Sequence, residues 1–142
     1  MSVHYLEEDR KATGFNRTAT KNWLHEVVRL EGMKPGVISY IFCSDEFLLG
    51  INIQFLKHDY YTDVISFDYT ERGIISGDIM ISVDRIQENA KKMGVSYLDE
   101  LKRVMVHGLL HLIGYDDTTK ELKARMSSRE DLYLAMAREQ VK

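Results

Sequence analysis

Apolar residues recur along this chain at two spacings, one typical of strands and one typical of amphipathic helices. Runs dense in β-branched and aromatic residues predict strands at residues 2–7, 37–43, 63–69 and 78–83. Apolar positions three or four apart predict helices at residues 20–30, 85–93 and 120–139, and further helices that begin after Ser44 and Ser96. This alternation predicts an α/β (α+β) fold, an open mixed sheet of about four strands with helices packed on it.

Turn-forming residues separate several of these elements. Pro35 and Gly36 predict a turn before the second strand, and the loop at residues 70–76 is short enough to join the third and fourth strands as a hairpin. Gly94 is expected to close the helix at residues 85–93. The first helix is expected to bury Trp23, Leu24, Val27 and Leu30, and the last helix Leu122, Met126, Leu132 or Tyr133, and Met136.

The segment at residues 104–113 has no polar side chain except His107 and His111, which predicts a helix buried almost all round. Residues four apart in a helix share one face, so the two imidazoles should project side by side. Gly114 stands where a helix commonly ends, and the reversed chain can bring Asp117 back toward the imidazoles. The sequence therefore predicts that these three side chains meet at one point.

Two imidazoles and a carboxylate are the ligand types of a divalent cation site. Burying unpartnered imidazoles is costly, and a cation at their neutral nitrogens would satisfy both. The alternative is that each histidine is a hydrogen-bonded core residue. We favour a metal site with His107, His111 and Asp117 as ligands. Zinc proteases carry such a pair as HExxH, but Gly108 follows the first histidine here, so the proteolytic base is absent.

The stretch HGLLHLIGYDD resembles the HGxLHLxGYDH signature of the YbeY family, which are zinc-dependent endoribonucleases that act on ribosomal RNA. INIQFLKHDYYTDVISFDY and SGDIMIS resemble the family's other signature blocks, in the same order and at similar spacing. The blocks span residues 51–117, and the chain has the family's size. The resemblance implies an α/β layout with the metal in a cleft between sheet and helices. It also implies ribosomal RNA, and the ribosome or small-subunit assembly factors, as partners.

Two positions depart from the family pattern. Asp117 stands where the family usually has a third histidine ligand, and its negative charge would make a bound water less acidic. Zinc is the metal that the resemblance implies, and the carboxylate makes manganese or iron alternatives. Leu56 stands where the family commonly carries an arginine able to hold a phosphate, and Lys57 and His58 follow it as substitutes. We take Lys57 as a candidate substrate-binding residue.

The chain has a formal net charge of -3 and a pI near 5.9, which does not indicate tight autonomous nucleic-acid binding. A local groove could still be basic. Arg103 lies four residues before His107 on the same helix flank and is a second candidate for holding a substrate phosphate. The remaining lysines and arginines fit solvated helix faces.

Four other side chains are candidates for the same cleft. Asp63 and Asp78 are expected to border it, as catalytic or merely structural carboxylates. Asp116 is expected to hydrogen-bond a ligating histidine, and Met126 to fill the core or floor the metal pocket. The single Cys43 excludes an internal disulfide and fits a buried strand position.

The chain, taken as one domain over residues 1–142, is expected to be a metal-dependent endoribonuclease of single-stranded RNA in ribosomal RNA maturation and ribosome quality control. The cation would activate a water or polarise a phosphate oxygen, and no further catalytic residue is assigned. The alternatives are a ribosome-assembly binding factor with a structural metal, or a hydrolase of another substrate. No apolar stretch marks a signal peptide or membrane span, so a cytoplasmic location is expected.

Overall fold

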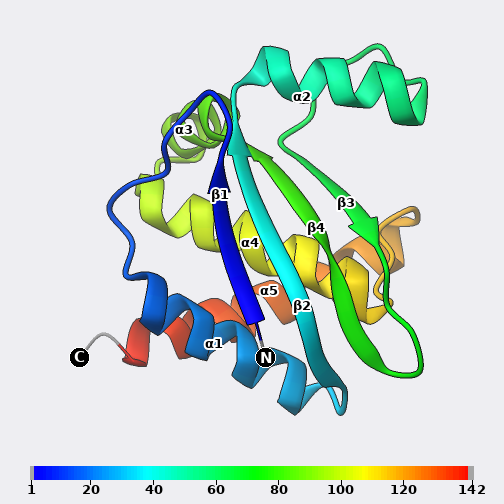
Figure 1. Cartoon of the computed structure of the whole chain (residues 1–142). Helices are drawn as coiled ribbons and strands as arrows, with labels where there is room; N and C mark the ends of the chain where they lie inside the picture. The colour runs from blue at the N-terminus through cyan, green and yellow to red at the C-terminus, as the bar shows by residue number, and fades with distance from the viewer. Residues whose placement is uncertain (1, 141–142) are drawn as a thin grey trace.

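The computed structural model describes residues 2–140 and contains one four-stranded sheet (Figure 1). Its strands are β1 (Ser2–Glu7), β2 (Lys34–Cys43), β3 (Val64–Asp68) and β4 (Ile74–Ser82). Their spatial order is β1-β2-β4-β3; β1, β2 and β4 are parallel, and β3 pairs antiparallel with β4 at one edge. The predicted mixed sheet and the predicted β3–β4 hairpin are confirmed.

Helices cover both faces of this sheet unequally. They are α1 (Arg17–Leu30), α2 (Asp45–Ile51), α3 (Val83–Met93), α4 (Tyr97–Ile113) and α5 (Lys120–Gln140). A π-helical turn, Asn52–Leu56, continues α2. Helices α1, α3 and α4 pack on one face, α5 packs on the same side against α4 and α1, and α2 packs over one end of the opposite face (Figure 1). Within residues 2–140, no helix has both the length and the apolar character that a membrane crossing requires.

The helix ends follow the local chemistry of the sequence. The side chains of Ser44 and Ser96 accept hydrogen bonds from the amides of Phe47 and Asp99, so both predicted N-caps are confirmed. Gly94 ends α3 with a φ of 67°, a conformation that costs glycine little.

The main hydrophobic core lies between the sheet and the four helices on its covered face. Its large side chains include Trp23 and Tyr40, and their polar atoms are satisfied inside the protein. The Trp23 indole donates to the Tyr133 carbonyl at 2.8 Å, and the Tyr40 hydroxyl donates to the Met105 carbonyl at 3.0 Å. These two bonds tie α1 to α5 and β2 to α4.

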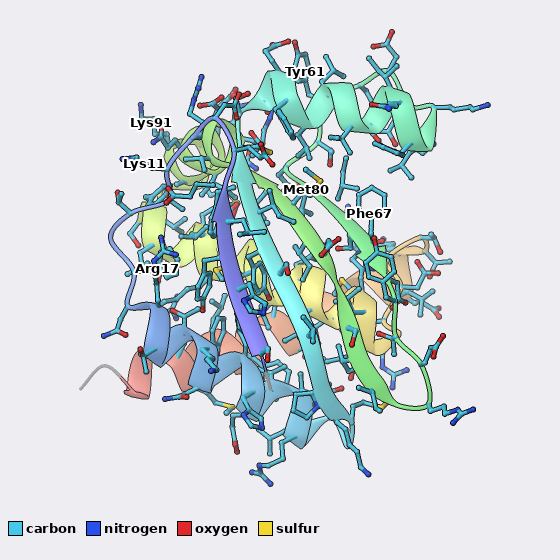
Figure 2. All side chains as sticks on the ribbon, viewed as in Figure 1. Lys11, Arg17, Tyr61, Phe67, Met80 and Lys91 are labelled. Carbon is cyan, nitrogen blue, oxygen red and sulfur yellow. The ribbon has the colours of Figure 1, made fainter. Side chains whose placement is uncertain are left out.

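A smaller apolar cluster occupies the opposite face beneath α2. Met80 of β4 and Phe67 of β3 lie on this side of the sheet (Figure 2), with Leu48 of α2 and Cys43 packed beside them. Cys43 is fully buried, as the sequence predicted, and burial raises the pKa of its thiol to about 12. This cluster fixes α2 and the π-helical turn against the sheet.

Two predictions about local structure are wrong. Pro35 and Gly36 lie inside β2 and form no turn, since Lys34 and Pro35 pair with Ile74 and Ile75 of β4. The register between β2 and β4 shifts between Pro35 and Ile38, which accommodates a residue that has no amide hydrogen. Leu30, expected to face inward, is 48% exposed because it is the last residue of α1.

Helix α4 is buried almost all round, as predicted, and packs against β3, β4, α3 and α5. Gly108 allows its close approach to the sheet. A Cβ atom added at Gly108 would lie 2.7 Å from Cγ2 of Ile79, a fully buried side chain of β4. The same helix carries both histidines, so this packing sets their position relative to the sheet.

Gly108→Ala is expected to destabilise the protein by about 1–3 kcal/mol, because the added methyl group overpacks the α4–β4 contact. Gly50→Ala in α2 is the matched control. A Cβ at Gly50 meets nothing within 4 Å, so its better helix propensity should stabilise by about 0.5–1 kcal/mol. Denaturant-induced unfolding measures both changes. Equal stability of the two variants would contradict the close packing at Gly108.

Candidate metal centre

His107 and His111 lie on an edge of α4 that the core leaves partly open. Their side chains are 25% and 30% exposed. The two ring centroids are 4.7 Å apart, the rings stand nearly perpendicular at 83°, and the two Nε2 atoms approach to 3.1 Å. The helical spacing therefore brings the two imidazoles together, as the sequence predicted.

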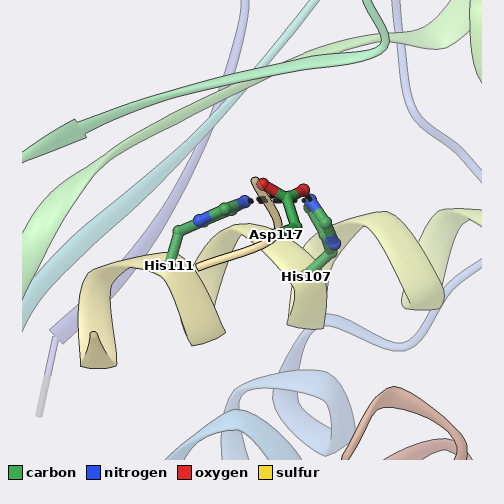
Figure 3. Close-up of side chains that lie close together, drawn as sticks. All are labelled: His107, His111 and Asp117. Atoms are coloured by element: carbon green, nitrogen blue, oxygen red, sulfur yellow. Dashed lines mark hydrogen bonds and ion pairs between the residues drawn. The ribbon is translucent and has the colours of Figure 1, made fainter. Parts of the chain in front are cut away.

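Asp117 returns to this edge because α4 ends abruptly at Gly114. Gly114, with a φ of 122°, donates its amide to the carbonyls of Leu110 and His111, each at 3.1 Å. The Asp117 carboxylate then lies 3.6 Å from Nε2 of His107 and 3.5 Å from Nε2 of His111 (Figure 3). One ligand atom from each of the three residues lies within 4.8 Å of the other two.

The Nδ1 atoms of both rings are hydrogen-bonded to groups outside the cluster, which leaves the two Nε2 atoms available to bind a cation. Nδ1 of His111 lies 3.1 Å from the Tyr115 carbonyl oxygen, which can only accept, so Nδ1 carries the hydrogen. Nδ1 of His107 lies 2.6 Å from the Glu130 carboxylate. In the neutral rings, both Nε2 lone pairs then point toward one another and toward the Asp117 carboxylate. Two imidazole nitrogens and a carboxylate oxygen so arranged form a donor set suited to a divalent cation.

Glu130 of α5 is the partner that the sequence analysis missed. It is 94% buried, being 6% exposed, and also accepts from Arg103 at 3.0 Å. Burial lowers the pKa of His107, but the hydrogen bond and charge of Glu130, together with the charge of Asp117, outweigh burial and raise it. A signal was present in the sequence: Glu130 lies four residues after Met126 and three before Tyr133, on the inward face of the last helix.

Asp116 does not contact a histidine, and that prediction is wrong. Its carboxylate accepts from the amides of Asp117 and Thr118, at 2.7 and 3.1 Å, and from the Thr118 hydroxyl. This local turn captures the carboxylate because an aspartate reaches the amides that follow it at little entropic cost. Its effect on the site is indirect, through the conformation of the loop that carries Asp117.

The histidine edge opens into a cleft of about 630 Å³. One wall is α4 with the Asp117 loop, and the other is β3 with the π-helical turn and the loop that follows it. Asp63 lines this cleft, as predicted. Asp78 does not line it and instead accepts a hydrogen bond from the Tyr69 hydroxyl at 3.3 Å. Leu56 lines the cleft with an exposed fraction of 41%.

The two candidate substrate-binding cations lie at different places. Lys57 ends the π-helical turn with a φ of 58° and is not among the residues that line the cleft. Arg103 lies beside the site, but its guanidinium pairs with Glu130 and Asp131 at 3.0 and 2.9 Å. A substrate phosphate would have to compete with these carboxylates for Arg103. Met126 is 1% exposed and belongs to the main core.

Comparison with known proteins connects this site to a family. A family model described as Endoribonuclease YbeY matches residues 5–138. A protein named Endoribonuclease YbeY from Parabacteroides distasonis is 43% identical over 140 residues, which cover 99% of each chain. One of the same name from Chlorobaculum tepidum is 50% identical over 122 residues, which cover 83% of this chain and 89% of that one.

A solved structure supports the same assignment at the level of the fold. The solution structure of a Thermotoga maritima protein superposes with a TM-score of 0.64 at 26% sequence identity. The match covers 97% of this chain and 93% of that one.

Glu100 of α4 is a buried carboxylate close to the metal centre. It lines a second cavity of about 370 Å³, which His107, Asp63 and Glu130 also line. Glu100 is 3% exposed, and its Oε1 atom has no hydrogen-bond partner among the described residues. Burial, with a smaller contribution from the charge of Asp63, raises the pKa of Glu100 to about 7.

Glu100→Gln is expected to increase the free energy of unfolding near pH 8 and to change it little near pH 4.5. The folded-state pKa of about 7 lies above the ordinary value of 4.5, so the stability that this carboxyl contributes is present below pH 4.5 and is lost as the pH rises through 7. The gain near pH 8 should be about 1–3 kcal/mol. Urea unfolding of both metal-free proteins measures it. A variant that is no more stable than the wild type at either pH would contradict the raised pKa.

Proposed function

Since this chain belongs to the YbeY family of endoribonucleases, we propose that it is a metal-dependent endoribonuclease that cleaves single-stranded RNA during ribosomal RNA maturation and ribosome quality control. The observation that carries the proposal is the convergence of two Nε2 atoms and the Asp117 carboxylate in an open cleft, with both Nδ1 atoms already engaged. The proposal takes residues 1–142 as one such domain, because one sheet and the helices packed around one main core account for the described residues 2–140.

His107, His111 and Asp117 would hold the cation. When bound, such a cation supplies Lewis-acid polarisation of the scissile phosphate. Zinc is the metal we propose, since four-coordinate sites with imidazole and carboxylate ligands suit it, while the carboxylate leaves manganese or iron as alternatives.

The chain's own side chains orient the reaction. Glu130 and the Tyr115 carbonyl accept hydrogen bonds from the Nδ1 atoms of His107 and His111, which keeps the hydrogen of each ring on Nδ1 and leaves Nε2 free to bind the cation. Three carboxylates line the cleft. Asp117 is assigned to the cation, and Asp68 accepts a hydrogen bond from the Thr70 amide at 2.8 Å. We therefore assign Asp63 to accept a proton from the attacking group. Lys57 and Arg103 remain proposed phosphate contacts at the margins of the cleft.

The proposed partners are ribosomal RNA and the ribosome or its small-subunit assembly factors, with the reaction in the cytoplasm. Leu56 favours one alternative, because a leucine in the cleft offers no contact to phosphate. In that alternative the protein is a ribosome-assembly binding factor whose metal is structural. Turnover of RNA separates the two functions.

The direct test is turnover of a labelled single-stranded RNA with and without added zinc or manganese. His111→Ala is expected to lose bound metal and to lower turnover by about a hundredfold or more, because one of three ligands is deleted. His25→Ala, on the exposed face of α1, is the control and should keep both. Circular dichroism checks folding, which metal binding can affect. Metal-independent turnover, or full turnover by His111→Ala, would overturn the proposal.

Asp117→His is expected to shift metal preference toward zinc over manganese, by about tenfold or more. The substitution replaces an anionic oxygen ligand with a neutral imidazole nitrogen, which zinc favours more than manganese does. Competition of the two metals, measured on both proteins by elemental analysis after dialysis, gives the ratio. If the ratio does not change, Asp117 does not bind the metal.

Glu130→Gln is expected to lower metal affinity by about tenfold, because the neutral amide holds the His107 ring less firmly and makes its nitrogen less basic. Asp131→Asn is the matched control: Asp131 pairs with the same Arg103 but is 67% exposed and does not contact His107. Titration with a chromophoric chelator compares the affinities. A loss as large in Asp131→Asn would assign the effect to Arg103 and not to the hydrogen bond.

A further inference from the structure

The cleft wall opposite the metal centre is built by the π-helical turn and the loop after it. The turn ends at Lys57, whose left-handed backbone conformation, φ 58° and ψ 32°, redirects the chain. The next residues to line the cleft are His58 and Tyr60. A π-helical turn is an uncommon element that is frequent at functional sites.

Asn52 holds this loop at two points. Its carbonyl accepts from the amide of His58 at 3.1 Å, and its side-chain amide donates to the carbonyl of Tyr60 at 2.9 Å. Asn52 itself is buried, with 2% exposure. The two bonds bracket the segment from His58 to Tyr60, so its conformation is fixed before any ligand binds.

Tyr61 anchors the same loop on its other side. The Tyr61 hydroxyl donates to Glu46 of α2 at 2.7 Å. The guanidinium carbon of Arg85 lies 5.5 Å from the centroid of the Tyr61 ring. Figure 2 shows Tyr61 beside α2. Tyr61 is not among the cleft-lining residues, and His58 and Tyr60 are.

His58 and Tyr60 form a stacked pair. The ring centroids are 5.2 Å apart, the planes differ by 18°, and the Tyr60 hydroxyl lies 3.0 Å from Nδ1 of His58. When the hydroxyl donates to Nδ1, the ring hydrogen of a neutral imidazole is on Nε2. The atom that His58 offers to a ligand is then an Nε2–H donor.

Few of the side chains that line the cleft can bind an anion. The charged side chains that line it are Asp63, Asp68 and Asp117, and none of the lining residues is a lysine or an arginine. His107 and His111 are assigned to the cation. His58 is the remaining histidine among the lining residues, and its Nε2–H can donate to an anion.

We propose that His58, positioned by Tyr60 and Asn52, binds a phosphodiester group of the RNA strand opposite the metal centre. The proposal rests on the proposed function, because it takes RNA as the ligand. It identifies the phosphate contact within the cleft as His58 and assigns Lys57, which does not line the cleft, at most a peripheral contribution.

Binding of a fluorescent ten-nucleotide 2′-O-methyl oligouridine to the metal-loaded full chain tests this proposal, because the probe retains the phosphates and lacks the free 2′-hydroxyls. His58→Ala should weaken binding about tenfold, and His58→Arg should restore it, since a guanidinium also donates to phosphate. The slope of log affinity against log salt should be steeper by about 0.7 in His58→Arg than in His58→Ala. Tyr60→Phe should weaken binding about threefold, as it removes the bond to Nδ1.

His25→Ala is the matched control and should bind as the wild type does, with metal content equal in all variants. His58→Ala binding within twofold of the wild type would overturn the inference. So would a loss that His58→Arg does not restore, or a loss that appears in Lys57→Ala and not in His58→Ala. Cleavage of the all-ribose oligonucleotide by the wild type is measured in parallel. If the wild type cleaves and His58→Ala binds normally, this inference alone fails; if the wild type does not cleave, the proposed function fails.

Discussion

The burial of α4 is the constraint on which the site depends. The helix lies between the sheet and α5 and approaches β4 closely at Gly108, so it can neither rotate nor slide without overpacking Ile79. His107 and His111 lie on an edge of α4 that the core leaves partly open. Because the core fixes the helix, it also fixes where the two imidazoles meet. A ligand that bridges them would encounter a preformed site.

Hydrogen bonds to groups outside α4 orient the two histidine rings that the core positions. Glu130 reaches His107 from α5, and the carbonyl of Tyr115 reaches His111 from the loop after α4. Both partners act on the nitrogen that faces away from the cleft, so they select the ring form that can bind a cation. Across the cleft, Asn52 holds its own wall in the same preorganised manner. The chemistry that we propose therefore depends on polar side chains that are held in place by the hydrophobic core and by these hydrogen bonds.

Local features of this site could be predicted from the sequence, and long-range ones could not. The distance between His107 and His111 follows from the helical period, and the return of Asp117 follows from Gly114, so both are encoded within a few residues. Glu130 lies 23 residues from its histidine, and only the packing of α5 on α4 brings the two together. The hydrogen-bond partner of Asp116 could not be predicted either, because its carboxylate accepts from the two amides that follow it and not from a ring nitrogen.

The same distinction holds for the fold. The strands follow from runs of β-branched and aromatic residues, and the caps follow from single serines. Pro35, in contrast, lies inside β2 because the pairing of β2 with β4 tolerates a shift of register beside it, which the local sequence does not show. The central claim concerns metal coordination, and X-ray absorption at the metal edge of the protein loaded with one equivalent of zinc tests it most directly. We predict two imidazole ligands and oxygen ligands at about 2.0–2.2 Å. A spectrum without imidazole scattering would contradict the account.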